Sequence, residues 1–233
     1  MAGILYGIGV GPGDPELLTV KAVKAIEGAD VIIAPQSKMG ADSVAQSIAA
    51  PYIKPGTKIC PMVFPMVPNT DEWVEASKKN YEIIAAYLEE GLNVVFLTLG
   101  DPMFFSTYMY IFRLMENSPY TVVTIPGIPA FCAIGSQLGY PIVEKEEILS
   151  ILPATANKEK LDRALAACDN AVLMKVSKDF ANIKELLDKN GLLEHAMMVC
   201  RCGLPDEEIL MVKDVPSDAK VNYLSTILTK RNK

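Results

Sequence analysis

The sequence predicts an α/β protein of two domains: an N-terminal domain with a five-stranded, mostly parallel sheet, and a C-terminal α+β domain with a mixed sheet. Apolar, β-rich runs alternate with helical patterns through the first 140 residues, as in βαβ units. The pattern then changes within the segment 140–147, which becomes polar and charged after Pro141. We therefore expect domains at residues 1–143 and 144–233.

Five strands and five helices are expected in the first domain, from apolar periodicity and the turn residues that bound it. The expected strands are 3–10, 30–34, 58–62, 93–99 and 121–125, and the expected helices are 20–27, 43–49, 71–90, 106–115 and 130–138. The longest helix has Thr70 and Asp71 as its cap and stops at Gly91. Its apolar face is formed by Trp73, Ser77, Tyr81, Ile84 and Leu88.

In the second domain, five further strands and two helices are expected. The strands are 148–153, 171–176, 197–202, 208–212 and 222–228, and the helices are 158–167 and 180–190. The last three strands are joined by short polar segments such as 203–207. A parallel connection needs a longer crossover, so at least one pair of these strands should be antiparallel.

Composition and charge favour a small-molecule role. The 233 residues are 50% hydrophobic, enough for a substantial core, and the net charge of −6 with a pI near 5.0 argues against nucleic-acid or anionic-membrane binding. The N-terminus has no signal-peptide pattern, and no window reaches the roughly 20 uncharged residues of a membrane span. We expect a cytoplasmic protein.

The cysteines also suit a reducing compartment, because five irregularly spaced thiols do not form a disulfide framework. Cys200 and Cys202 would share one strand face, but no second Cys/His pair completes a structural zinc site, so no metal is expected. The single histidine, His195, is expected at the surface or in the core rather than as a catalytic base.

The first strand leads into a glycine-rich loop. Gly7, Gly9 and Gly11 alternate at its carboxyl end, where open α/β sheets bind ligands, so backbone N–H groups there can approach a ligand closely. No Gly-Lys-Ser/Thr follows, and Pro12 and Pro15 interrupt the Rossmann spacing, so neither an NTP nor NAD is favoured. A tight strand-to-helix turn is the alternative interpretation.

Two further loops follow strands in the same way. Asp101 stands at the tip of the fourth strand, with Ser106 or Thr107 placed to cap the next helix, and Gly127 marks the loop after the fifth. Since these loops lie at the carboxyl ends of parallel strands, we expect all three to converge. Glycine, proline and one carboxylate suit a zwitterionic or cationic ligand, although Asp101 could simply cap a turn. No nucleophile–base relay is visible.

Four segments resemble the tetrapyrrole methylases of cobalamin synthesis: 5–22, 97–108, 125–131 and 172–176. The resemblance runs from Leu5 to about Glu208. Segments 64–73, 106–108 and 174–175 resemble in particular the branch that methylates C20 of precorrin-2 or cobalt-factor II. This resemblance implies an S-adenosyl-L-methionine-dependent C-methyltransferase that acts as a homodimer and holds its cofactor in the cleft between the two domains.

The resemblance also implies which residues contact the cofactor, from which S-adenosyl-L-homocysteine would be the product. They are Pro12 on the first loop, Leu99, Gly100, Asp101, Phe104, Ser106 and Thr107 on the second, Pro129 and Ala130 on the third, and Lys175 and Gly203 in the second domain. Phe105 replaces a common tyrosine, and the Pro129-Ala130 pair replaces a frequent Thr-Ser. Backbone contacts would survive both changes.

The implied acceptor carries many carboxylates, which fixed cations should bind. Arg201 is the first candidate, Lys38, Arg113 and Lys175 are the others, and Lys178 is expected to be a solvated charge. Tyr108 is expected as a further, uncharged substrate contact. The proton lost from C20 could pass to Asp101, Tyr108 or solvent, so no catalytic residue is assigned.

Other interpretations stay open at this point. The acceptor could be another precorrin, diphthine or ribosomal RNA, or the protein could bind the donor without turnover. The sequence does not distinguish a cobalt-loaded from a metal-free acceptor. The number and spacing of the cysteines slightly favour an anaerobic organism, and with it the cobalt-loaded acceptor. Met62, Phe64 and Met66 could supply an apolar dimer patch or belong to the core.

Overall fold

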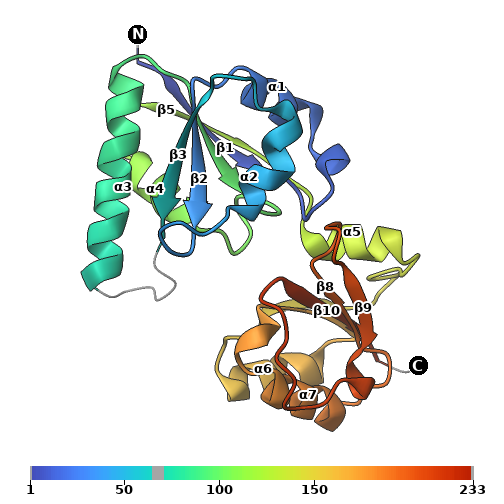
Figure 1. Cartoon of the computed structure of the whole chain (residues 1–233). Helices are drawn as coiled ribbons and strands as arrows, with labels where there is room; N and C mark the ends of the chain where they lie inside the picture. Colours follow the sequence, from blue (N-terminus) through green and yellow to red (C-terminus); the bar gives the residue numbers. More distant parts are fainter. Residues whose placement is uncertain (1, 65–70, 232–233) are drawn as a thin grey trace. The chain divides into compact units, whose positions relative to one another are not determined.

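The computed structural model describes residues 2–64 and 71–231 and divides into two compact units, Met1–Pro129 and Ala130–Lys233 (Figure 1). Each unit contains one five-stranded sheet. The division precedes helix α5 (Ala130–Gln137), whereas we expected the boundary after it, at 143/144. The physical reason for the difference is that α5 packs against strand β10 (Ser225–Lys230) of the second unit.

The sheet of the first unit has the order β3-β2-β4-β1-β5, and all its pairs are parallel, as expected. Its strands are β1 (Ile4–Gly9), β2 (Val31–Gln36), β3 (Lys58–Val63), β4 (Val94–Thr98) and β5 (Thr121–Ile125). Because parallel strands share one carboxyl edge, the loops after β1, β4 and β5, which are neighbours in the sheet, emerge side by side.

Four helices of the first unit connect these strands: α1 (Val20–Glu27), α2 (Val44–Ala49), α3 (Asp71–Glu89) and α4 (Tyr108–Met115). Thr19 caps α1 by accepting from the N–H of Ala22, and Ser43 caps α2. The predicted face of α3 is the buried one at Ser77, Ile84 and Leu88. Its predicted cap residue Thr70 lies outside the described residues.

The core of the first unit includes two residues considered for a dimer patch. Met62 and Phe64 are 2% and 3% exposed, and the Phe64 ring packs edge-on against Phe96 with centroids 5.6 Å apart. Both therefore stabilise the monomer by apolar burial. Met66, the third member of the suggested patch, lies outside the described residues.

The sheet of the second unit has the order β6-β7-β10-β8-β9; β6 and β7 are parallel and the other pairs antiparallel, which confirms the mixed sheet. Its elements besides α5 and β10 are β6 (Leu149–Pro153), α6 (Lys158–Ala167), β7 (Asn170–Met174), α7 (Phe180–Lys189), β8 (Met197–Cys200) and β9 (Glu208–Met211). Strands β7 and β8 end two residues earlier than predicted. Lys175 and Arg201, which follow them, adopt left-handed backbone conformations with φ of 61° and 54°.

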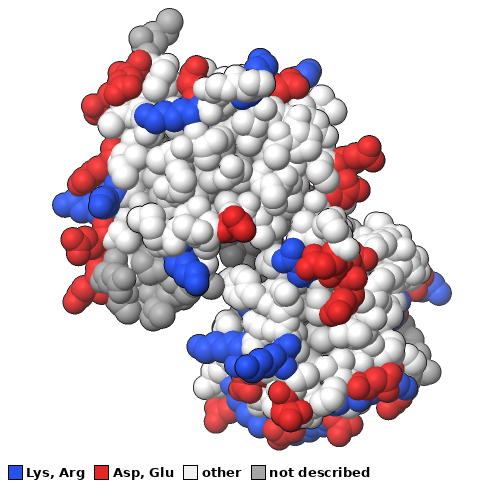
Figure 2. Space-filling model, viewed as in Figure 1, with Lys and Arg blue, Asp and Glu red and all other residues white. Residues whose placement is uncertain are grey.

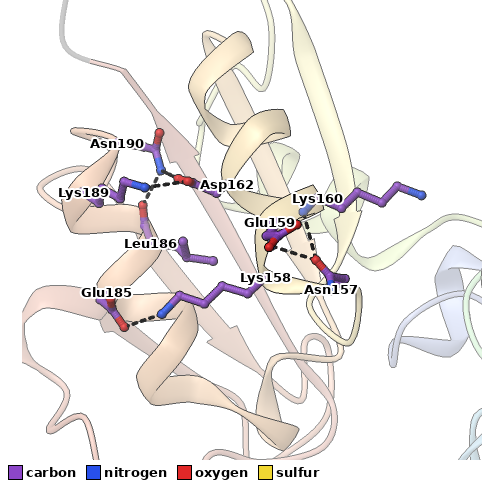
Figure 3. Close-up of polar contacts among 9 residues, drawn as sticks. All are labelled: Asn157, Lys158, Glu159, Lys160, Asp162, Glu185, Leu186, Lys189 and Asn190. Carbon is purple, nitrogen blue, oxygen red and sulfur yellow. Dashed lines mark hydrogen bonds and ion pairs between the residues drawn. The ribbon is translucent and has the colours of Figure 1, made fainter.

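Helices α6 and α7 lie side by side and share polar contacts at their exposed surface (Figure 3). Lys158 Nζ lies 2.8 Å from Glu185 Oε2, and Asp162 accepts from both Lys189 Nζ at 2.5 Å and Asn190 Nδ2 at 3.0 Å. Exposed pairs of this kind contribute little each. Most of the stability of this layer therefore comes from the apolar side chains beneath, such as Leu165 and Ile183.

Charge on the visible face is mixed rather than basic, as Figure 2 shows: Lys and Arg side chains stand among Asp and Glu in each unit, with uncharged areas between them. None of the helices built from residues 2–64 and 71–231 has both the length and the apolar character that a membrane crossing requires.

Candidate functional site

The loops after β1 and β4 are joined by backbone hydrogen bonds at the carboxyl edge of the first sheet. Gly100 N donates to Gly11 O at 2.8 Å, and Gly11 N donates to Gly100 O at 3.3 Å, forming an isolated antiparallel bridge. Val10 N also donates to Thr98 O at 2.9 Å. The two loops therefore leave the sheet as one hydrogen-bonded layer.

The loop after β5 packs onto this layer through glycine. A Cβ atom added to Gly9 would stand 2.5 Å from both Gly100 O and Gly127 N, and one added to Gly127 would overlap Gly100 O and the backbone of Gly9. Real Cβ contacts are never this short, so these positions admit no side chain without a shift of backbone. The structure thus brings the three predicted loops together within the first unit.

Asp101 fastens the second loop to the third. Its Oδ2 accepts a hydrogen bond from Gly127 N at 3.0 Å, and its Oδ1 accepts from Met103 N at 2.8 Å. Charge-assisted bonds from backbone N–H groups to a carboxylate are stronger than neutral ones. The carboxylate therefore acts first as a clamp between loops, a role that the sequence did not reveal.

Beside this junction two glycines are packed less tightly than Gly9 and Gly127, and a Cβ atom at either would make only ordinary van der Waals contact. Gly100 has φ of 69°, and a Cβ there would meet nothing nearer than Pro129 Cα at 4.0 Å; at Gly11, with φ of 76°, the nearest atom would be Leu17 Cβ at 3.6 Å. Thr98 Oγ1, just before the second loop, is buried and has no hydrogen-bond partner among the described residues. These features suit a small ligand that approaches backbone groups closely.

The remaining predicted residues of the first unit lie around this edge. Pro12 is buried, and Leu99, Phe104 and Pro129 are half-buried. Ser106 caps α4, because its Oγ accepts from Tyr108 N at 2.9 Å, whereas the Thr107 side chain makes no capping bond within the described part of the chain.

Tyr108, expected as a substrate contact, is instead part of the core of the first unit. It is 0% exposed and lies beneath Gly7, whose Cβ position its ring occupies. Its hydroxyl is 3.0 Å from Thr124 Oγ1, and burial raises its pKa. The glycine at position 7 therefore makes room for this ring rather than for a ligand.

The two predicted cations of the first unit differ in position. Lys38 is exposed in the segment after β2, at the same carboxyl edge as the three loops. Arg113 is exposed in the last turn of α4, which returns the chain to the start of β5 at the opposite edge. The structure therefore places Lys38, and not Arg113, at the edge where the loops meet.

In the second unit, Lys175 and Arg201 flank the beginning of β10. They directly follow Met174 and Cys200, which pair with Thr226 and Ser225 respectively. Burial lowers the pKa of Lys175. Arg201 Nε lies 2.6 Å from Asp206 Oδ2, and this arginine lowers the pKa of that carboxyl. Lys178, expected to be a solvated charge, is exposed.

The turn between β8 and β9 contains the last predicted cofactor residue, Gly203, with φ of 73°. Gly203 N donates to Glu207 Oε2 at 2.6 Å. Asp206 and Glu207 lie in a segment that the sequence pattern indicates only as a polar linker, so neither was predicted. The available signal was the placement of two acidic residues within a few positions of Arg201 and Gly203.

The cysteine pair does not form a shared face, because the left-handed Arg201 separates Cys200 from Cys202. Cys200 Sγ is 3.1 Å from Ser225 Oγ, and Cys202 Sγ is 3.9 Å from Gln137 Oε1. Over the described ranges, no three His, Cys, Asp or Glu side chains are grouped to hold a metal ion. His195 is exposed.

These features define an α/β protein whose glycine-rich loops meet at the carboxyl edge of a parallel sheet, the edge at which such folds bind small molecules. The sequence profile described as Tetrapyrrole (Corrin/Porphyrin) Methylases matches residues 4–214. The chain therefore belongs to the tetrapyrrole methylases.

Two curated relatives agree with this assignment. The chain is 34% identical to the cobalt-precorrin-2 C(20)-methyltransferase of Salmonella typhimurium, over 99% of this chain and 98% of that protein. It is 35% identical to the precorrin-2 C(20)-methyltransferase of a Sinorhizobium species, with 97% and 94% covered.

A crystal structure of uroporphyrin-III C-methyltransferase from Thermus thermophilus, complexed with S-adenosylhomocysteine, shares the fold at a TM-score of 0.72 and 19% identity, with 98% and 92% covered. The chain is also 34% identical to the cobalamin biosynthesis protein CobIJ of Mycobacterium tuberculosis. That match covers 96% of this chain but only 45% of the longer protein.

Proposed function

We propose that this protein is an S-adenosyl-L-methionine-dependent C-methyltransferase that methylates C20 of precorrin-2 or its cobalt-containing counterpart in cobalamin biosynthesis. Its family and two relatives, 34% and 35% identical over nearly the whole chain, support this proposal. The structural observation that carries it is the meeting of three glycine loops at the carboxyl edge of the first sheet, where the family resemblance implies the methyl donor.

The donor site that we propose uses backbone groups more than side chains. It comprises Pro12, the segment Leu99–Asp101 with Phe104, and Pro129 in the first unit, and Ala130 at the start of the second. The Ser106 hydroxyl already accepts from Tyr108 N, and Asp101 already accepts from two backbone N–H groups. Their contribution is therefore to hold the loops in place. In the second unit Lys175 and Gly203 complete the proposed set.

S-adenosylmethionine supplies, when bound, an activated methyl group that carries its own leaving group. The chain then needs no covalent nucleophile, and its task is to hold the acceptor carbon in line and to exclude water. The carbon–carbon bond forms as the carbon–sulfur bond breaks, and C20 afterwards loses a proton. The Tyr108 hydroxyl is buried against Thr124, and the Asp101 carboxylate already accepts hydrogen bonds from the backbone N–H groups of Gly127 and Met103. We assign the proton to solvent.

The acceptor would be held through its carboxylates. Arg201 remains our first candidate, with Lys38 at the carboxyl edge of the first sheet as the second. Changing Arg201 to Ala should raise the KM for the tetrapyrrole more than it weakens donor binding, and an unchanged KM would remove this residue from the site. Assembly as a homodimer in the cytoplasm is also part of the proposal, and sedimentation of the purified protein tests the dimer.

Calorimetry with S-adenosylmethionine, followed by turnover with precorrin-2 prepared with and without cobalt, tests the function. We expect donor binding and a product heavier by one methyl group, with the label at C20. Donor binding without methylation of either acceptor would favour another acceptor. Absence of donor binding would overturn the proposal.

A further inference from the structure

A hydrogen-bond network in the second unit connects α5 to the turn after β8. Glu207 Oε2 accepts from Gly203 N at 2.6 Å, and Glu207 Oε1 accepts from Gln137 Nε2 at 2.5 Å. Gln137 is the last residue of α5, which lies against this turn (Figure 1). The other amide atom of Gln137, Oε1, faces Cys202 Sγ at 3.9 Å.

The donors and acceptors of this network fit together. Burial and the neighbouring Glu207 raise the pKa of the Cys202 thiol to about 11, so the thiol keeps its proton and can donate weakly to Gln137 Oε1. The amide then presents its Nε2 to Glu207. Each oxygen of the Glu207 carboxylate thus has a separate donor, one on the turn and one on the helix.

The network joins two parts of the proposed donor site. α5 begins at Ala130 and ends at Gln137, and the turn contains Gly203. The turn is also conformationally demanding, because Arg201 and Gly203 both have positive φ. Since Glu207 occupies the Gly203 N–H, the group that Gly203 can offer a ligand is its carbonyl oxygen, an acceptor suited to an amino group.

We propose that Glu207 is a positioning residue for the methyl donor: by bonding Gly203 N and Gln137 together, it fixes the β8–β9 turn against α5 in the form that binds the donor. The inference rests on the proposed function. It assigns no contact between Glu207 and the reacting atoms.

The experiment measures the dissociation constant of S-adenosylhomocysteine by calorimetry, and the melting temperature, for the full chain and its variants. Glu207→Ala should weaken binding about tenfold, the effect expected when a charge-assisted hydrogen bond is lost. Gln137→Glu should weaken it similarly, because two carboxylates would then face each other. The double variant Gln137→Glu/Glu207→Gln should restore binding to within about threefold, because the amide at position 207 would accept from Gly203 N and donate to the carboxylate at position 137.

Glu185→Gln is the matched control. It removes the ion pair between Glu185 on α7 and Lys158 on α6 of the same unit and should leave the dissociation constant unchanged (Figure 3). Unaltered binding in Glu207→Ala, or no recovery in the double variant, would overturn the inference. If Glu207→Ala fails to fold, the comparison of Gln137→Glu with the double variant decides alone. A wild-type protein that does not bind S-adenosylhomocysteine would instead overturn the proposed function.

Discussion

Replacing Gly9 by alanine perturbs the junction of the three loops with a single methyl group. That methyl would lie 2.5 Å from Gly100 O and from Gly127 N, about 0.9 Å short of ordinary van der Waals contact. Both obstructing atoms belong to backbone, so no side chain can rotate away. Overpacking of this kind destabilises a protein by about 1–3 kcal/mol. The second and third loops must separate from the first.

Gly7→Ala is the matched control, because Gly7 lies on the same strand and faces in the same direction two residues earlier. Its added methyl would overlap the Tyr108 ring, which is fully buried, so this variant should also lose stability. The obstruction is a side chain of α4, however, and the three loops are not pushed apart. Melting temperatures and calorimetric binding of S-adenosylhomocysteine are measured for both variants.

We expect Gly9→Ala to bind S-adenosylhomocysteine at least tenfold more weakly than Gly7→Ala at a temperature where both are folded, since a loss of about 1.4 kcal/mol is tenfold in affinity. Equal affinity in the two variants would show that the junction of the loops does not shape the donor site. A crystal structure of Gly9→Ala with the Gly11–Gly100 bridge intact would refute the packing argument itself.

Three other predictions concern the second unit. Arg231 donates to the carbonyls of Leu165 and Asn190, near the ends of α6 and α7, at 2.8 Å each. Arg231→Met should therefore lower the free energy of unfolding, measured by urea titration, by about 2–3 kcal/mol. Arg163→Met, at an exposed position of α6, is the control. Hydrogen bonds from Lys189 and Asn190 lower the pKa of Asp162. This carboxylate therefore stabilises the native state above the unfolded pKa of about 4, and the stabilisation is lost as the pH falls through the folded pKa. Asp162→Asn should accordingly make the free energy of unfolding fall less steeply with decreasing pH in the acid range. The exposed Cys132 should react with a thiol reagent at pH 8 well before the buried Cys202, so Cys132→Ser, and not Cys202→Ser, should remove the fast phase. A fast phase that persists in Cys132→Ser would contradict the assignment.

The fold was predictable because its local signals agree with its tertiary packing. Helix α1 begins after Thr19, a capping residue, and ends before Gly28, and both bounds follow from the sequence. The antiparallel pairing of β8 with β9 follows from a connection too short for a crossover. The domain boundary was not predictable in the same way, because α5 packs against β10, the last strand of the sequence, and no local pattern reveals this contact.

The site was predictable only at the level of backbone. Glycines after β1, β4 and β5 predicted that three loops converge, and packing at Gly9 and Gly127 explains why those glycines are needed. The partners of polar side chains were not predictable. Asp101 bonds an amide 26 positions away, and Gln137 bonds a carboxylate 70 positions away, so neither partner can be inferred from spacing.

Two left-handed residues of the second unit, Lys175 and Arg201, directly follow strands, whereas a third, Lys145, lies before β6. Non-glycine residues rarely adopt positive φ, and such strain collects at functional sites. Lys175 and Arg201 adopt it directly after β7 and β8, and these strands flank β10, so both cations stand at one edge of one sheet, about 10 Å apart across β10. A glycine at either position would relieve the strain but would lose the positive charge. A cation at both positions fits the acceptor binding proposed above, in competition with the ion pair that Arg201 makes with Asp206. Lys175→Gly and Arg201→Gly should each stabilise the unit or leave it unchanged while raising the KM for the tetrapyrrole; if both variants retain the KM, the left-handed residues serve only to end their strands.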